Sequence, residues 1–120
     1  MFKRVLVVDD DRDILFGLKE LLQSASIDIT TADSREKAEA LLQSAFYDVV
    51  IADLMLSSSS PEDGLKLVHY IKAHHTDTRT IVITGCGESD IKNRAHEAGA
   101  TLVFVKPVPG AVLQRVVNTT

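Results

Sequence analysis

Three consecutive aspartates, Asp9, Asp10 and Asp11, directly follow an apolar run near the start of the chain. Two carboxylates about 5 Å apart repel each other by roughly 3 kcal/mol at an effective dielectric constant near 20. A small domain has only about 5–15 kcal/mol of net stability. The cluster therefore needs a bound proton or a cation, and Mg²⁺ prefers such oxygen ligands while keeping positions for water and a phosphoryl group.

Three further residues that suit phosphoryl chemistry each close an apolar run: Asp53, Thr84 and Lys106. A carboxylate can act as a nucleophile and form an acyl phosphate. An ammonium group can neutralise phosphoryl oxygens as a point charge. Together with the acidic cluster, these residues predict a site that holds a metal ion beside a phosphoryl group.

Alternating strands and helices must position these residues. Apolar runs rich in β-branched residues predict strands, and the first, third, fourth and fifth are apolar enough to predict burial on both faces, as in a parallel sheet. Amphipathic patterns between the runs predict helices, with Ser34 as an N-cap and Gly99 at a helix C-terminus. The expected strands are 4–9, 27–32, 47–53, 80–85 and 101–106, and the expected helices are 13–25, 34–45, 62–75, 89–99 and 110–117.

Five strand–helix repeats predict an α/β fold, a doubly wound parallel sheet with helices on both faces. Ligands of such sheets bind beyond the carboxyl ends of the strands, which is where Asp9, Asp10, Asp53, Thr84 and Lys106 fall. Adjacent aspartates after a strand are also common at helix starts, so Asp11 or Asp13 is expected to serve as a cap or first-turn acid.

Composition limits the classes of function. The chain has 120 residues, a net charge of −4 and no basic run, so we expect one domain over 1–120 that does not bind nucleic acid by itself. A single cysteine, Cys86, excludes an internal disulfide and suits a reducing cytosol. No segment resembles a signal peptide or a membrane span, so a cytoplasmic protein without membrane contact is expected.

The chain resembles the receiver domain of bacterial response regulators, the phosphoacceptor modules of two-component signalling. The resemblance lies in "VLVVDDDRD", "DVVIADLML", "IVITG" and "GATLVFVKPV", and it extends over essentially all 120 residues. It implies a flavodoxin-like five-stranded sheet of order 2-1-3-4-5 and a cis Lys106-Pro107 bond.

The resemblance also implies roles for individual residues. Asp53 would be phosphorylated, and Mg²⁺ would be bound by Asp53, by Asp10 directly, by Asp9 mainly through water and by the backbone carbonyl of Met55. Thr84 and Lys106 would contact phosphoryl oxygens. The donor would be a sensor histidine kinase or phosphotransfer protein, and the signal would pass through the helix 4/strand 5/helix 5 face to a downstream output domain or partner protein. The chain would catalyse only its own phosphorylation and dephosphorylation, and no output domain lies in residues 1–120.

The sequence departs from the family at a switch position. An aromatic residue usually lies three residues before the lysine, where this chain has Val103, and Phe104 is expected on the opposite face of the sheet because strand residues alternate. This departure leaves open a receiver-fold binding module that works without phosphorylation. A Mg²⁺-dependent phosphohydrolase is disfavoured because Met55 occupies the place of its second aspartate.

Two loops near the expected site also have distinctive sequences. The segment Ser57–Ser60 lengthens one loop, which is either a solvated connection or an element recognised by a kinase or phosphatase. Ser60 with Asp63 fits a capping box, with Pro61 at the first helical position. Met55 and Cys86 flank the expected phosphoryl site. Their side chains are unsuited to positioning an attacking water, so a long-lived phosphoryl group is expected.

Overall fold

The computed structural model describes residues 2–56, 60–85, 87 and 89–120. The expectations for Ser57–Ser59 and for Cys86 lie outside these residues. Strands and helices alternate along the chain, and the observed elements are β1 (Lys3–Val8), α1 (Arg12–Leu22), β2 (Ile27–Ala32), α2 (Arg35–Ser44), β3 (Val49–Asp53), α3 (Glu62–His74), β4 (Arg79–Thr84), α4 (Ser89–Ala98), β5 (Leu102–Val105) and α5 (Gly110–Thr119).

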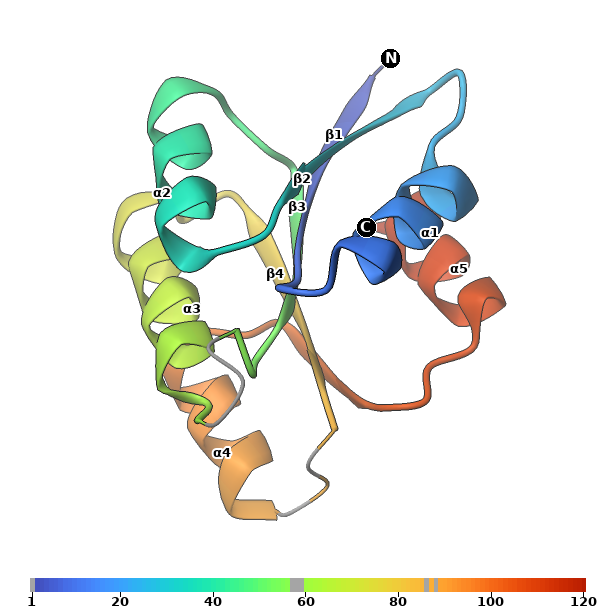
Figure 1. The fold of residues 1–120 in the computed structure, drawn as a ribbon. Helices are drawn as coiled ribbons and strands as arrows, with labels where there is room; N and C mark the ends of the chain where they lie inside the picture. Colours follow the sequence, from blue (N-terminus) through green and yellow to red (C-terminus); the bar gives the residue numbers. More distant parts are fainter. Residues whose placement is uncertain (1, 57–59, 86, 88) are drawn as a thin grey trace.

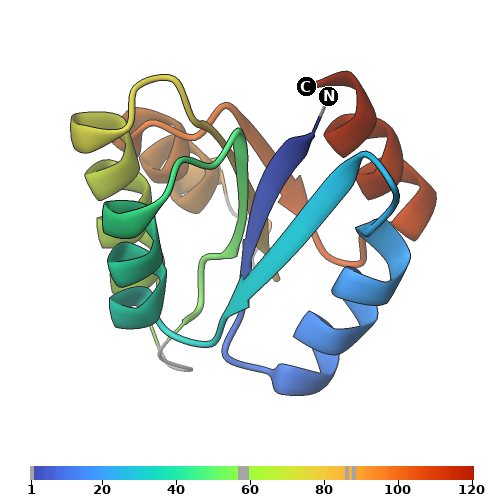
Figure 2. The ribbon, with the colours of Figure 1, turned by 90° about the horizontal axis from the view of Figure 1, so that it is seen from above.

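The strands form one parallel sheet in the order β2-β1-β3-β4-β5, which confirms the predicted fold class and strand order. Figure 1 shows α1 and α5 on one face of the sheet and α2, α3 and α4 on the other. Seen from above, the same two helix layers lie on either side of the strands (Figure 2). Lys3 Nζ donates to the backbone carbonyls of Val117 and Thr120 at 2.6 Å each, which ties the start of β1 to the end of α5.

Both faces of the sheet are packed, and alternate residues of each central strand enter different cores. In β1, Val5 and Val7 belong to the core beneath α1 and α5, whereas Leu6 and Val8 belong to the core beneath α2 and α3. Every residue of β3 is buried. This explains why the β1 and β3 sequences are apolar throughout instead of alternating, since a sheet covered on both sides leaves no solvent face.

The fifth apolar run was wrongly predicted to be buried on both faces. β5 is an edge strand, and Leu102 and Val105 at its two ends are 40% and 38% exposed. Its two central residues behave as expected from strand alternation: Val103 packs against the core beneath α3 and α4, while Phe104 packs against the core beneath α1 and α5. Phe104 therefore does lie on the opposite face from Val103.

Several helix ends match the predictions and others correct them. Ser34 caps α2 by accepting a hydrogen bond from the N–H of Lys37 at 3.1 Å, and Gly99 follows α4 with a φ of 126°. Helix α1 ends at Leu22 rather than at residue 25, because the chain becomes extended at Gln23.

The capping box predicted for α3 is not formed. Pro61, not Ser60, occupies the cap position, and its carbonyl accepts the N–H of Leu65 at 2.9 Å. Ser60 Oγ instead accepts the N–H of Glu62 at 3.2 Å. The Asp63 carboxylate pairs with Arg35 at 3.4 Å, so it bridges α3 to α2. In the part of the chain that the structure describes, no helix has the length and apolar character needed to cross a membrane.

Two glycines offer a matched test of how α3 packs against the end of β3. A Cβ atom on Gly64 would lie 2.1 Å from the carbonyl oxygen of Leu54, whereas a Cβ atom on Gly17 in α1 would meet nothing within 4 Å. We expect Gly64→Ala to lower the free energy of unfolding by roughly 2–4 kcal/mol. Gly17→Ala should raise it by about 0.5–1 kcal/mol, because alanine restricts the unfolded chain. Chemical denaturation measures both, and equal effects would contradict the close approach of α3 to Leu54.

Candidate functional site

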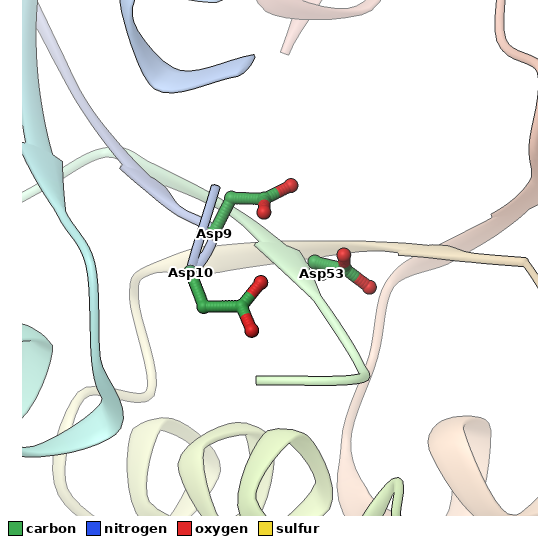
Figure 3. A group of neighbouring side chains, drawn as sticks. All are labelled: Asp9, Asp10 and Asp53. Carbon is green, nitrogen blue, oxygen red and sulfur yellow. The ribbon is translucent and has the colours of Figure 1, made fainter. Parts of the chain in front are cut away.

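Three carboxylates meet at one edge of the sheet. Asp9 and Asp10 follow β1, Asp53 ends β3, and one carboxylate oxygen from each lies within 4.8 Å of the others. Figure 3 shows the three side chains leaving the two strand ends toward a common region. The predicted convergence of the acidic residues is therefore confirmed.

Strand register produces this convergence. Val8 of β1 pairs with Ala52 of β3. The residues that follow this pair are Asp9 and Asp53, and they therefore lie side by side at the edge of the sheet. Neighbouring parallel strands end at the same edge, which means that the backbone alone brings the two carboxylates together. Both residues are buried, at 4% and 8% exposure, whereas Asp10 is exposed.

Burial changes the acidity of Asp9. Removal from water raises the pKa of the Asp9 carboxyl from 3.8 to about 6, and the nearby Asp53 charge acts in the same direction. A hydrogen bond from the N–H of Asp11 to Asp9 Oδ1 at 2.9 Å opposes the rise in pKa. The cluster thus carries an electrostatic cost that a cation would relieve.

Asp53 is held at both of its carboxylate oxygens. Oδ1 accepts the N–H of Met55 at 3.0 Å, and Oδ2 accepts a hydrogen bond from Lys106 Nζ at 2.9 Å. Burial acts to lower the pKa of Lys106, but the hydrogen bond and charge of Asp53, with the charges of Asp9 and Asp10, outweigh it and raise that pKa above its ordinary value. The ammonium group therefore stays charged beside Asp53 at neutral pH.

Asp11 belongs to the helix rather than to the cluster. It caps α1 by accepting the N–H groups of Asp13 and Ile14 at 2.9 and 3.3 Å, and Asp13 lies in the first turn. The structure thus separates the adjacent acids as predicted. Asp11 caps the free N–H groups at the start of α1, and Asp13 adds a negative charge in its first turn. Asp9 and Asp10 lie at the sheet edge.

Thr84 and Lys106 come from the neighbouring strand ends. Thr84 is fully buried at the end of β4, one residue beyond Ile83, which pairs with Asp53. The Thr84 carbonyl accepts the N–H of Lys106 at 2.8 Å. The Lys106-Pro107 peptide bond is cis, as predicted. Four adjacent strand ends therefore supply three carboxylates, a hydroxyl and an ammonium group.

The donor set fits a small divalent cation. Mg²⁺ binds oxygen at 2.0–2.1 Å, so two oxygens that both bind it directly are at most about 4.2 Å apart. Carboxylate oxygens within 4.8 Å of one another suit a site in which some bind directly and another binds through water. The Met55 backbone lies beside the cluster because its N–H bonds Asp53.

A pocket that sequence reasoning missed opens beside these residues. It has a volume of about 510 Å³ and lies between the sheet and the α1/α5 layer, with Asp9, Asp53 and Lys106 on its polar side. Its walls come from five separate elements and the segment that precedes α5. No sequence pattern signals the pocket, because its size depends on how far α1 and α5 lie from the strands.

Comparisons with known proteins agree with this geometry. Residues 5–118 match the family model described as "Response regulator receiver domain". The response regulator protein PilR of Pseudomonas aeruginosa is 33% identical over 117 residues, which cover 98% of this chain and 26% of PilR. The chain therefore spans about a quarter of that relative's length.

Solved structures show the same fold. The crystal structure of a CheY-like receiver domain protein from Methanospirillum hungatei matches with a TM-score of 0.90 at 24% identity, over 99% of this chain and 93% of that one. The chemotaxis response regulator CheY4 of Vibrio cholerae matches with a TM-score of 0.87 at 26% identity, over 99% and 98%. With its sheet order, its acidic strand ends and a family match over residues 5–118, this chain belongs to the response regulator receiver domain family.

Proposed function

We propose that this chain is a phosphorylation-driven signalling switch, in which Asp53 accepts a phosphoryl group from the phosphohistidine of a sensor histidine kinase or phosphotransfer protein. The observation that carries the proposal is the hydrogen bond of 2.9 Å between Lys106 Nζ and Asp53 Oδ2 within a cluster of three carboxylates. An isolated surface aspartate would have neither the cation nor the acidic neighbours. Membership of the family supports the same role.

The chemistry is a transfer between two nucleophiles. A carboxylate oxygen of Asp53 forms the new bond to phosphorus while the bond from phosphorus to the histidine nitrogen of the donor breaks. Lys106 lies where it offsets the negative charge of the transferred group, and the N–H of Met55 holds the other Asp53 oxygen in place. Catalysis is then mainly positioning and electrostatics. Hydrolysis of the acyl phosphate resets the switch, and no separate substrate is turned over.

Asp9, Asp10 and Asp53, with the backbone carbonyl of Met55, would hold Mg²⁺, with Asp9 acting mainly through water. The ion supplies positive charge that lets a phosphoryl group approach three carboxylates. The raised pKa of Asp9 supports this assignment, because it reports a carboxyl group whose charged form lacks sufficient stabilisation in the protein alone.

The conformational signal would begin at Thr84. Its hydroxyl would turn toward a phosphoryl oxygen, and its backbone carbonyl already bonds Lys106 at the end of β5. Movement there would reach the α4/β5/α5 face, where Leu102 and Val105 are exposed. The half-buried Val103 fills the place of the usual aromatic against α3 and α4, so the readout would depend on backbone shifts rather than on an aromatic rotamer.

The cellular setting follows from the proposed role. The protein would act in the cytoplasm, receive its phosphoryl group there, and pass the signal to an output domain or partner protein, without itself binding nucleic acid or membrane. The second candidate is a binding module that works without phosphorylation. Val103 is the observation that favours it, and the intact cluster around Asp53 speaks against it.

Labelling of Asp53 tests the proposal directly. Incubation with a small phosphodonor and Mg²⁺ should add one acid-labile and hydroxylamine-labile phosphoryl group, seen by intact mass, because Asp53 is the nucleophile. Asp53→Asn should abolish the addition, and Asp28→Asn on the exposed face of β2 should leave it unchanged. Equal labelling of the wild type and Asp53→Asn would refute the assignment and favour the binding module.

The pKa of Asp9 predicts how Mg²⁺ stabilises the fold. Because the folded protein binds the Asp9 proton more tightly than the unfolded chain does, stability without metal falls as pH rises from about 4 to about 6, by up to roughly 3 kcal/mol. Mg²⁺ favours the charged carboxylate, so it should raise the free energy of unfolding more at about pH 7.5 than at about pH 5.

Denaturation with and without Mg²⁺ at the two pH values measures this difference. In Asp9→Asn, most of the fall in the free energy of unfolding between about pH 5 and about pH 7.5 without Mg²⁺ should disappear. Asp28→Asn, which removes an exposed carboxylate, serves as the control and should keep that fall. Stabilisation by Mg²⁺ that is the same at both pH values, in the wild type, would show that Asp9 does not share the site.

The lifetime of the phosphoryl group tests the role of the Met55 side chain, which lies half-buried beside Asp53. An apolar side chain cannot orient water for attack on the acyl phosphate, so we expect slow dephosphorylation. Met55→Asn should shorten the phosphoryl half-life about threefold or more, and Met55→Leu should leave it within about twofold. A half-life that is unchanged in Met55→Asn would mean that water is positioned elsewhere.

A further inference from the structure

A pocket of about 510 Å³ lies between the sheet and the α1/α5 layer. Protein interiors are normally packed as densely as organic crystals, with few voids larger than a water molecule. Small-molecule sites typically measure about 300–1,000 Å³ and combine apolar walls with a few convergent polar groups. The size and the mixed lining of this pocket therefore fall within the range of small-molecule sites.

The walls of the pocket are almost entirely apolar. Its floor is formed by buried residues of three adjacent strands, and its opposite wall is formed by two residues of α1 and one of α5. These six residues are Val7, Ile51, Ile83, Ile14, Leu18 and Leu113. Ile14 is 38% exposed, so the pocket wall reaches solvent beside α1.

The polar side of the pocket carries excess negative charge. Asp9 and Asp53 line it together with Lys106, and Asp10 belongs to the same carboxylate cluster. Lys106 is engaged by Asp53. Among the ion pairs of the described residues, none includes Asp9 or Asp10. A ligand head group in this pocket meets the two carboxylates of Asp9 and Asp53 and the one ammonium group of Lys106, so a cation is favoured over an anion.

We propose that this pocket binds a small amphipathic amine, with its apolar body between the sheet and α1/α5 and its ammonium group at Asp9 and Asp53. Because the ammonium group takes the place of a divalent cation, amine and Mg²⁺ compete. An amine of this class therefore slows phosphorylation of Asp53 when Mg²⁺ is limiting. Amine binding itself needs no phosphorylation, so it can be tested independently of the proposed function.

Binding of phenethylamine to the unphosphorylated protein tests the proposal, with methyl NMR of the pocket residues as the readout. The amine should shift the Val7, Ile51 and Ile83 methyl signals and bind at least about tenfold more tightly than phenethyl alcohol or hydrocinnamate, which lack the positive charge. Mg²⁺ at ten times its own dissociation constant should weaken the apparent amine affinity roughly tenfold.

Substitutions locate the site. Val108→Phe and Ile14→Phe place a larger side chain at the pocket wall and should each weaken amine binding about tenfold. Val116→Phe is the matched control, because Val116 is also partly buried against the same core but is not among the residues that line the pocket, and it should leave binding within about twofold. Thermal denaturation checks that each variant folds.

Four results would overturn the proposal: no methyl shifts with the amine, equal binding of the alcohol or the carboxylate, insensitivity to Mg²⁺, or equal effects of Val116→Phe and both wall variants when all three are folded. If the amine binds as expected but the protein takes no label from a phosphodonor with excess Mg²⁺ and no amine, the proposed function alone is refuted.

Discussion

Repulsion among three carboxylates at one sheet edge is the constraint on which the rest of this structure depends. Asp9 and Asp53 are buried side by side, and Asp10 lies within reach of both. The protein balances only part of this charge, through the Lys106 ammonium on Asp53 and the Asp11 N–H on Asp9. Burial of Asp9, with a smaller contribution from the Asp53 charge, still raises the pKa of the Asp9 carboxyl to about 6. A site with this charge imbalance favours the binding of cations, which the proposed transfer of a phosphoryl group requires.

The sheet supplies the rigidity that makes such crowding possible. β1 and β3 lie at the centre of five strands and are buried on both faces, so their ends cannot separate to relieve the repulsion. The close approach of Gly64 to the backbone of Leu54 fixes the segment that follows Asp53. The more exposed parts lie elsewhere, at the edge strand β5 and along α5. Burial is thus greatest in the strands that carry the crowded charge, and the change in conformation proposed above would involve the more exposed edge of the sheet.

The carboxylate cluster lies between solvent and an apolar pocket. On its outer side the cluster meets solvent through Asp10 and Lys106, and on its inner side it borders an apolar pocket beneath α1 and α5. A metal ion, a phosphoryl group and a small amine would all draw on the same carboxylates. Competition among them would add a second chemical input to the signalling switch proposed above, through the ligand that occupies the pocket.

The sequence by itself determined the fold class and most of the site, because both depend on local patterns. Continuous apolar runs predicted buried parallel strands, and parallel strands must end at one edge, so the meeting of Asp9, Asp53, Thr84 and Lys106 followed from their positions at the strand ends. Only the tertiary structure decided which apolar run became the exposed edge, that Asp63 pairs with Arg35 instead of closing a cap, and that a pocket opens behind the cluster. These features depend on distances between elements remote in the chain, which no local spacing of residues encodes.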